Sequence, residues 1–248
     1  MSIDTPEELA AMRRVGALVA HTLRVLRAAV RPGITTGALD ELAQKEFARA
    51  GASSGPADLV GFPGCICISV NEEVVHGVPG ARVLREGDLV SLDVTPLLDG
   101  FCADAAITVH VGRPRAEAVR LLGVADECLR AAVRAAVPGA ALNTIGGATE
   151  RVADRAGVSV YEELTGHGVG RSMHEEPTVP NVFVPRLRRK LQDGLVLAIE
   201  PMIGLGSDEL ELRDDGWTIA TADGSLSAHV EHTVVVRRGG GQILTSAA

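Results

Sequence analysis

Aromatic residues are scarce in this chain, since its 248 residues include one Trp, one Tyr and four Phe. Ala, Val and Leu must therefore form most of the core. The hydrophobic fraction of 46% and the charged fraction of 23% are typical of a globular protein. No apolar run is long enough to cross a bilayer, and the N-terminal residues show no signal-peptide pattern. A chain of this length can bury a full core in one large domain.

Lysine is also scarce, occurring only at Lys45 and Lys190. The 24 Lys and Arg against 32 Asp and Glu give a net charge of −8, which argues against a partner held through nucleic-acid phosphates. The four cysteines show neither a disulfide framework nor zinc-ribbon spacing; they are Cys65, Cys67, Cys102 and Cys128. We therefore expect reduced thiols and a cytoplasmic protein.

Helix start and stop signals predict two pairs of helices. Thr5 and Glu8 form a capping-box pattern around Pro6, and similar signals recur along the chain. The expected helices cover residues 6–30, 36–50, 114–136 and 143–156. Residues 52–64 are expected to be a loop because Gly, Ser and Pro are frequent there. Each half thus reads as two helices followed by strands, which predicts two related halves and an antiparallel or mixed sheet.

A hairpin with two acids on one face is predicted within the first half. Apolar and polar residues alternate from Val90 to Thr95, and Asp99-Gly100 is a strong two-residue turn signal. This turn places Asp93 opposite Ala106 and diagonal to Asp104, within about 7–8 Å. Carboxylates this close repel each other and need a cation between them. Two solvent-facing acids on an edge hairpin are the alternative.

Three further polar side chains interrupt apolar or glycine-rich segments. Glu200 follows the apolar run 195–199, Glu231 lies in the strand expected for residues 227–236, and His167 lies in a glycine-rich loop. With the two hairpin aspartates they provide four carboxylates and one imidazole, the donor set of a site for two metal ions. Each residue alone has a structural explanation, but four unpaired acids in one core would unfold it.

Several segments, taken in order, resemble the bacterial-type methionine aminopeptidases of type I. The matching segments are residues 69–79, 87–94, 99–104, 166–177, 199–202 and 227–233. This resemblance implies an α+β "pita-bread" fold, with two pseudo-symmetric halves and a curved, mainly antiparallel sheet covered by helices on its outer face. We expect one catalytic domain over residues 1–248, with halves of about 1–113 and 114–248. The subtype is indicated by the lack of an extension before the first helix and of a large insertion between His174 and Glu200.

The resemblance also implies a role for each member of the donor set. The five implied ligands of two divalent ions are Asp93, Asp104, His167, Glu200 and Glu231. Co, Mn, Fe and Zn all suit such ligands. Glu200 is also implied as the general base, and His76 and His174 as contacts of the substrate and its transition state. Without the resemblance, a lone His76 after two valines would more readily be a structural histidine.

The implied pocket for the methionine side chain is lined by Phe62, Cys67, Met173 and Trp217, with His76 at its rim. The sequence departs from the family pattern at three positions. Met173 replaces the usual Phe, His229 replaces a common Gln, and Leu59 falls where an aromatic residue is often found. We expect these three departures to affect the methionine pocket rather than the metal ligands.

The implied function is metal-dependent removal of the N-terminal methionine from nascent proteins and peptides whose second residue is small. Two alternatives stay open: a prolidase-like dipeptidase, and an inactive pita-bread module that only binds peptides. The implied partners are nascent N-termini at the ribosome. We expect a monomer in the cytoplasm that binds neither nucleic acid nor membrane.

Overall fold

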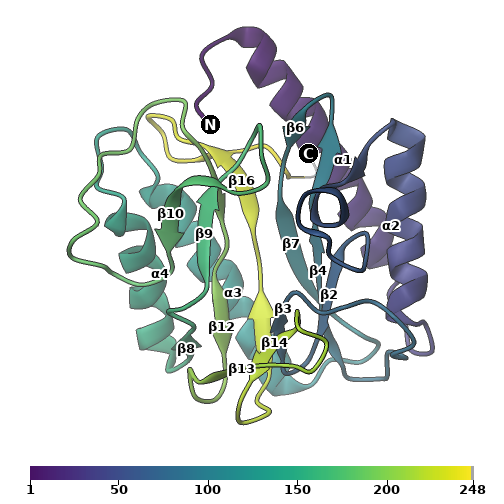
Figure 1. Cartoon of the computed structure of the whole chain (residues 1–248). Coiled ribbons are helices and arrows are strands. Elements are labelled where there is room, and N and C mark those ends of the chain that lie inside the picture. Colours follow the sequence, from purple (N-terminus) through teal and green to yellow (C-terminus); the bar gives the residue numbers. More distant parts are fainter. Residues whose placement is uncertain (247–248) are drawn as a thin grey trace.

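The computed structural model describes residues 1–246, so residues 247 and 248 of the expected domain lie outside the described part. Strands occupy the middle of the molecule, with one helix pair on each side (Figure 1). The helices are α1 (Pro6–Ala29), α2 (Thr36–Ala50), α3 (Ala116–Ala135) and α4 (Asn143–Ala156). None of the helices within residues 1–246 is long and apolar enough to cross a membrane.

The predicted helix ends agree closely with the structure. The side chain of Thr5 accepts a hydrogen bond from the Glu8 amide at 3.2 Å, and Glu8 completes the capping box at the start of α1. The helix α2 ends at Gly51, which adopts the left-handed conformation that favours glycine. The helix α3 begins at Ala116, two residues later than expected, because Arg115 is still extended.

Short strands connect these helices, and all the pairings between them are antiparallel. Within residues 1–246 they are β1 (Ser53–Ser54), β2 (Cys67–Val70), β3 (Glu73–Val75), β4 (Leu89–Val94), β5 (Pro96–Leu98), β6 (Phe101–Cys102), β7 (Ala105–His110), β8 (Ser159–Val160), β9 (Thr165–Gly168), β10 (Glu175–Pro180), β11 (Val196–Ile199), β12 (Met202–Gly204), β13 (Leu210–Leu212), β14 (Ile219–Thr221), β15 (Ser227–His229), β16 (His232–Val235) and β17 (Gln242–Ile243). The expected α+β class is confirmed. The segment 52–64 is not a plain loop, because it contains β1 and a π-helical turn, η1 (Pro56–Val60).

The central hairpin has the predicted register. Asp93 of β4 pairs with Ala106 of β7, and Leu98 pairs with Phe101 at the turn. Asp99 and Gly100 have φ values of 51° and 78°, and positive φ at both central residues is required by the tight turn that matches strand twist. The turn therefore determines which face of β4 carries Asp93.

The two halves meet along the segment that joins β15 to β16. The expected continuous strand 227–236 is interrupted at Val230 and Glu231, because the Glu231 amide donates to the carbonyl of Ala106 in the first half at 2.9 Å. On one side of the interruption β15 pairs with β12, and on the other β16 pairs with β11. In Figure 1 this segment runs through the middle of the molecule, between the two groups of strands.

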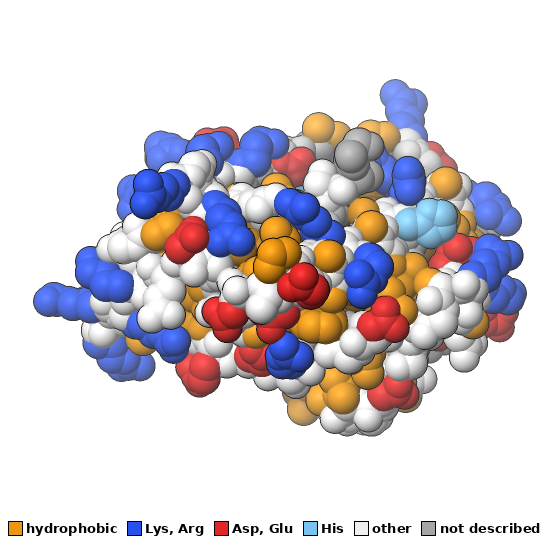
Figure 2. Space-filling view, turned by 90° about the horizontal axis from the view of Figure 1, so that it is seen from above, with side chains coloured by type: hydrophobic (Ala, Val, Ile, Leu, Met, Phe, Trp, Pro, Cys, Tyr) orange, Lys and Arg blue, Asp and Glu red, His pale blue; other side chains and the backbone are white. Residues whose placement is uncertain are grey.

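The surplus of acidic residues does not form one continuous patch on the face seen in Figure 2. Arg and Lys side chains are scattered over this face, with Asp and Glu and small apolar areas between them. Ion pairs such as Arg171 with Glu8 lie at the surface. Individual exposed pairs of this kind contribute at most about 1 kcal/mol.

Candidate metal centre and substrate pocket

The structure brings the five predicted metal ligands together between the two halves. Asp93 lies on β4, His167 on β9, Glu200 just after β11 and Glu231 between β15 and β16, while Asp104 directly precedes β7. His167 Nε2 is 3.3 Å from Glu200 Oε1 and 3.9 Å from Asp104 Oδ2. All five line one cavity of about 290 Å³.

The possible ligand atoms form two overlapping groups. One comprises Asp104, His167 and Glu231, and the other comprises Glu200, His229 and Glu231, with the atoms of each group within 4.8 Å of one another. Because Glu231 belongs to both, it is suited to bridge two neighbouring ions. Asp93 belongs to neither group, but it faces Asp104 across the same cavity.

Burial makes this cluster of acids unfavourable without a cation. It raises the pKa of Asp93, Glu200 and Glu231 well above the usual range, and the charge of Asp104 raises each of them further. Asp93 Oδ1 and Glu231 Oε1 are buried and have no hydrogen-bond partner within residues 1–246. Buried acceptors of this kind need a partner, and hard oxygen donors with one imidazole fit divalent metal ions.

Two threonines that the sequence analysis did not single out hold Asp104 in place. Thr95 Oγ1 donates to Asp104 Oδ1 at 2.7 Å, and Thr233 Oγ1 contacts the backbone of Asp104 from the other half. Thr95 lies two positions after the predicted ligand Asp93, and Thr233 lies two positions after the predicted ligand Glu231. The alternation of side chains along a strand could have identified them as residues on the ligand face.

The two predicted substrate-contacting histidines lie at the mouth of this cavity. His76 and His174 are exposed and line it together with the acids. Desolvation is the main cause that lowers the pKa of both histidines. A nearby histidine lowers each pKa further: His174 acts on His76, and His167 acts on His174. The rings of His167 and His174 are 4.4 Å apart, edge to face. His76 has a φ of 57°, a strained value for this residue type that is typical of functional sites.

A second, smaller cavity adjoins the first and matches the predicted side-chain pocket. It has a volume of about 170 Å³. All four predicted wall residues line it, together with His76, His174, Pro56, Val60, Thr95, Asp93 and Asp104. The rings of Phe62 and Trp217 meet edge to face at 5.3 Å. Leu59 was expected to touch this pocket, but it is not among the lining residues, and its neighbour Val60 lines the wall instead.

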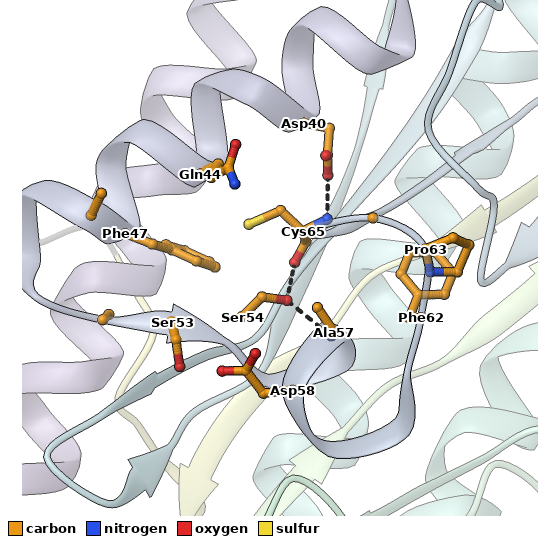
Figure 3. A pocket seen from close by; sticks show the side chains of 13 residues that line it. Asp40, Gln44, Phe47, Ser53, Ser54, Ala57, Asp58, Phe62, Pro63 and Cys65 are labelled. Carbon is orange, nitrogen blue, oxygen red and sulfur yellow. Dashed lines mark hydrogen bonds between the residues drawn. The ribbon is translucent and has the colours of Figure 1, made fainter.

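A larger cavity of about 550 Å³ lies outside the cluster, between α2 and the segment 52–65 (Figure 3). Asp40 accepts a hydrogen bond from the amide of Cys65 at 2.8 Å, and Ser54 donates to the carbonyl of Cys65 at 2.7 Å (Figure 3). Asp40 also accepts from the amide of Ile66 at 2.9 Å. These bonds hold the segment that delivers Phe62 to the smaller pocket. None of the residues lining this cavity is a histidine, so it lacks the imidazole donor of the metal cluster.

His229 does not lie where it was expected. It is absent from the walls of the side-chain pocket and lies instead among the acids, with Nε2 3.7 Å from Glu200 Oε2 and 3.6 Å from Glu231 Oε2. The expectation that it would affect only the methionine pocket was therefore wrong.

Comparisons with known proteins agree with this geometry. The profile of metallopeptidase family M24 matches residues 10–238. The methionine aminopeptidase of Clostridium perfringens is 43% identical to this chain, over 98% of the length of each. That of Treponema pallidum is 45% identical, over 98% of this chain and 95% of its own length. The crystal structure of methionine aminopeptidase from Thermotoga maritima matches with a TM-score of 0.96 at 37% identity, over 100% of both chains. These similarities confirm the pita-bread fold, and the chain belongs to the methionine aminopeptidases of metallopeptidase family M24.

Proposed function

We propose that this chain removes the N-terminal methionine from peptides and nascent proteins whose second residue is small. The main observation in support is that the acid cluster and the apolar pocket share a wall. This wall is formed by Asp93, Asp104, His76 and His174. A methionine side chain in the smaller pocket would hold its own peptide bond against the cluster. The mainly apolar residues Pro56, Val60, Phe62, Met173 and Trp217 in the lining of this pocket favour an apolar side chain.

We propose Asp93, Asp104, His167, Glu200 and Glu231 as the ligands of two divalent ions. When bound, such ions supply a water of lowered pKa and polarise the carbonyl of the substrate. Glu200 lies beside His167 at the cavity wall and is placed to accept a proton there as general base. Co, Mn, Fe and Zn remain the candidate metals, because affinity alone does not select among them.

We assign the two histidines at the mouth to the substrate's peptide bond. His174 adjoins both cavities and would donate to the carbonyl oxygen as negative charge develops on it, which is a major source of rate enhancement. His76, which also lines both cavities, would contact the amide nitrogen of the leaving group. Phe62, Cys67, Met173 and Trp217 would bind the methionine side chain.

We also propose that the chain is one catalytic domain, with halves of about 1–113 and 114–248, that acts as a monomer. The chain would act on nascent N-termini at the ribosome, in the cytoplasm. The position of the cluster supports the single domain, since its ligands come from strands of both halves.

The test is hydrolysis of Met-Ala-Ser by the purified chain, first stripped with chelator and then reloaded with each metal, with products identified by mass spectrometry. We expect release of Met only after reloading and near-complete loss of turnover in Glu200→Gln. An Xaa-Pro dipeptide is the comparison substrate. Preferential cleavage of that dipeptide would support the prolidase-like alternative, and peptide binding without cleavage would support the inactive module. Full activity in protein shown by elemental analysis to be metal-free would refute the proposal.

A further inference from the structure

We propose that His229 is a sixth protein ligand of the metal centre, binding through Nε2 the ion held by Glu200 and Glu231. This inference rests on the proposed function, because it concerns the same pair of ions. It goes beyond the five-ligand set by adding a second imidazole. The neighbouring His232 has no such role, because its Nδ1 pairs with Thr245 Oγ1 at 2.9 Å on the opposite side of the strand.

The distances fit a shared ion better than direct hydrogen bonds. His229 Nε2 is 3.7 Å from Glu200 Oε2 and 3.6 Å from Glu231 Oε2, and both separations exceed the range of N–H···O hydrogen bonds, about 2.7–3.2 Å. Ligand atoms that each lie about 2.0–2.2 Å from one ion are separated by roughly 3–4 Å. The two separations from Nε2 therefore already match those within a coordination sphere, and the possible ligand atoms of all three residues lie within 4.8 Å of one another.

The nitrogen that points at these acids is buried and unpartnered. His229 is 1% exposed, and its Nε2 has no hydrogen-bond partner within residues 1–246. Orphaned polar atoms of this kind are rare in folded proteins and indicate a missing partner. Glu231 Oε1, in the same cluster, is orphaned as well, so a cation at this point would satisfy both residues.

The backbone of His229 is held from two sides, which keeps its ring aimed at the cluster. Thr108 Oγ1 donates to the carbonyl of His229 at 2.6 Å and accepts from its amide at 3.1 Å. Ser91 shares a further hydrogen bond with Thr108 at 2.8 Å. On the other side, β15 places His229 opposite Met202 of β12. Ligands held by rigid elements in this way have well-defined geometry.

A second imidazole changes which metal the centre prefers. Imidazole suits Zn, Fe, Ni and Cu, whereas carboxylate-rich sites suit Mn and Mg. We therefore infer that His229 raises the affinity of this chain for Zn relative to Mn.

The first experiment uses the wild-type chain and needs no variant. A crystal structure of the zinc-loaded chain is expected to show His229 Nε2 about 2.0–2.1 Å from one ion. Two ions bound with Nε2 more than 3 Å from both would overturn the inference while leaving the proposed function intact. A wild-type chain that binds no zinc would overturn the inference alone, and one that binds none of Co, Mn, Fe and Zn would overturn both.

The second experiment compares His229→Gln with the control His232→Gln. Calorimetric titration should show zinc binding weakened at least about 10-fold in His229→Gln, the lower end of the effect of losing a supporting group, with manganese binding much less affected. X-ray absorption of the zinc-loaded protein should show one imidazole fewer in this variant than in wild type. The control should match wild type in both measurements. The inference would be contradicted if all three proteins had the same zinc affinity and the same number of imidazole ligands. Circular dichroism checks that each protein is folded.

Discussion

Thr233 and Asp104 exchange two hydrogen bonds across the line where the halves meet. The amide of Asp104 donates to Thr233 Oγ1 at 2.8 Å, and Thr233 Oγ1 donates to the carbonyl of Asp104, also at 2.8 Å. A single buried hydroxyl thereby ties a proposed ligand of the first half to the strand β16 of the second. The relative position of Asp104 and Glu231 depends on this contact.

Thr233→Val should weaken both the fold and metal binding. The substitution keeps the side-chain shape but leaves two buried backbone groups of Asp104 without partners, at a cost of about 1–3 kcal/mol. For a chain of this size each kcal/mol lowers Tm by about 2–4 °C. Thr233→Ser, which keeps the hydroxyl, is the control and should stay close to wild type. Calorimetry measures both quantities, and a Val variant with unchanged Tm and metal affinity would show that the contact has no such role.

Met173→Phe should sharpen the preference for methionine. Met173 is 6% exposed in the pocket wall, and its sulfur lies beside Gly55. A flexible thioether can repack around different side chains, whereas a rigid ring cannot. A methylene difference in an apolar pocket is worth only about 1–3 kcal/mol. We expect a larger ratio of kcat/KM for Met-Ala-Ser over Leu-Ala-Ser in the variant, with metal content unchanged. An unchanged ratio would show that Met173 does not set this preference.

His174→Ala should lower kcat by about 10²–10³, the scale for removing one donor to a developing negative charge. The expected effect falls on kcat because the contact strengthens only in the transition state. Metal content is the control measurement, since His174 lies outside both groups of possible ligands. A change confined to KM would mean that His174 only binds the substrate.

In the metal-free chain, the contribution of His232 to stability should fall between about pH 6.5 and pH 4. Burial lowers the pKa of His232 to about 4, whereas an unfolded histidine titrates near 6.5. The unfolded chain therefore binds more protons in this window, so stability is present above it and lost as the pH falls through it. The free energy of unfolding in urea should be measured for wild type and His232→Gln. We expect the difference between the two values to shrink as the pH is lowered. A constant difference would contradict the assignment.

Local signals predicted the parts of the structure that depend on neighbouring residues. The turn residues Asp99 and Gly100 determined the register that pairs Asp93 with Ala106, and the capping pattern at Thr5 determined the start of α1. The identities of the clustered acids were also predictable, because a charged residue in an apolar strand is costly unless it is paired.

Long-range pairing limited the rest of the prediction. His229 reaches Glu200 because β15 pairs with β12, which places His229 opposite Met202, and no local pattern encodes that partner. The interruption at Glu231 likewise arises from a hydrogen bond to Ala106 in the other half. The π-helical turn that carries Val60 into the pocket was hidden within a segment whose composition indicated only a loop.

The position of Glu231 after the helices of both halves has a consequence for the order of events in biosynthesis. Glu231 belongs to both groups of possible ligands, and β16, which follows it, must pair with β11 from earlier in the chain. A partly translated polypeptide therefore contains the helices of both halves and most of the pocket before it contains a complete set of ligands. A protein proposed to act on other chains as they leave the ribosome thus becomes able to bind its metals only after the helices of both its own halves have been synthesised.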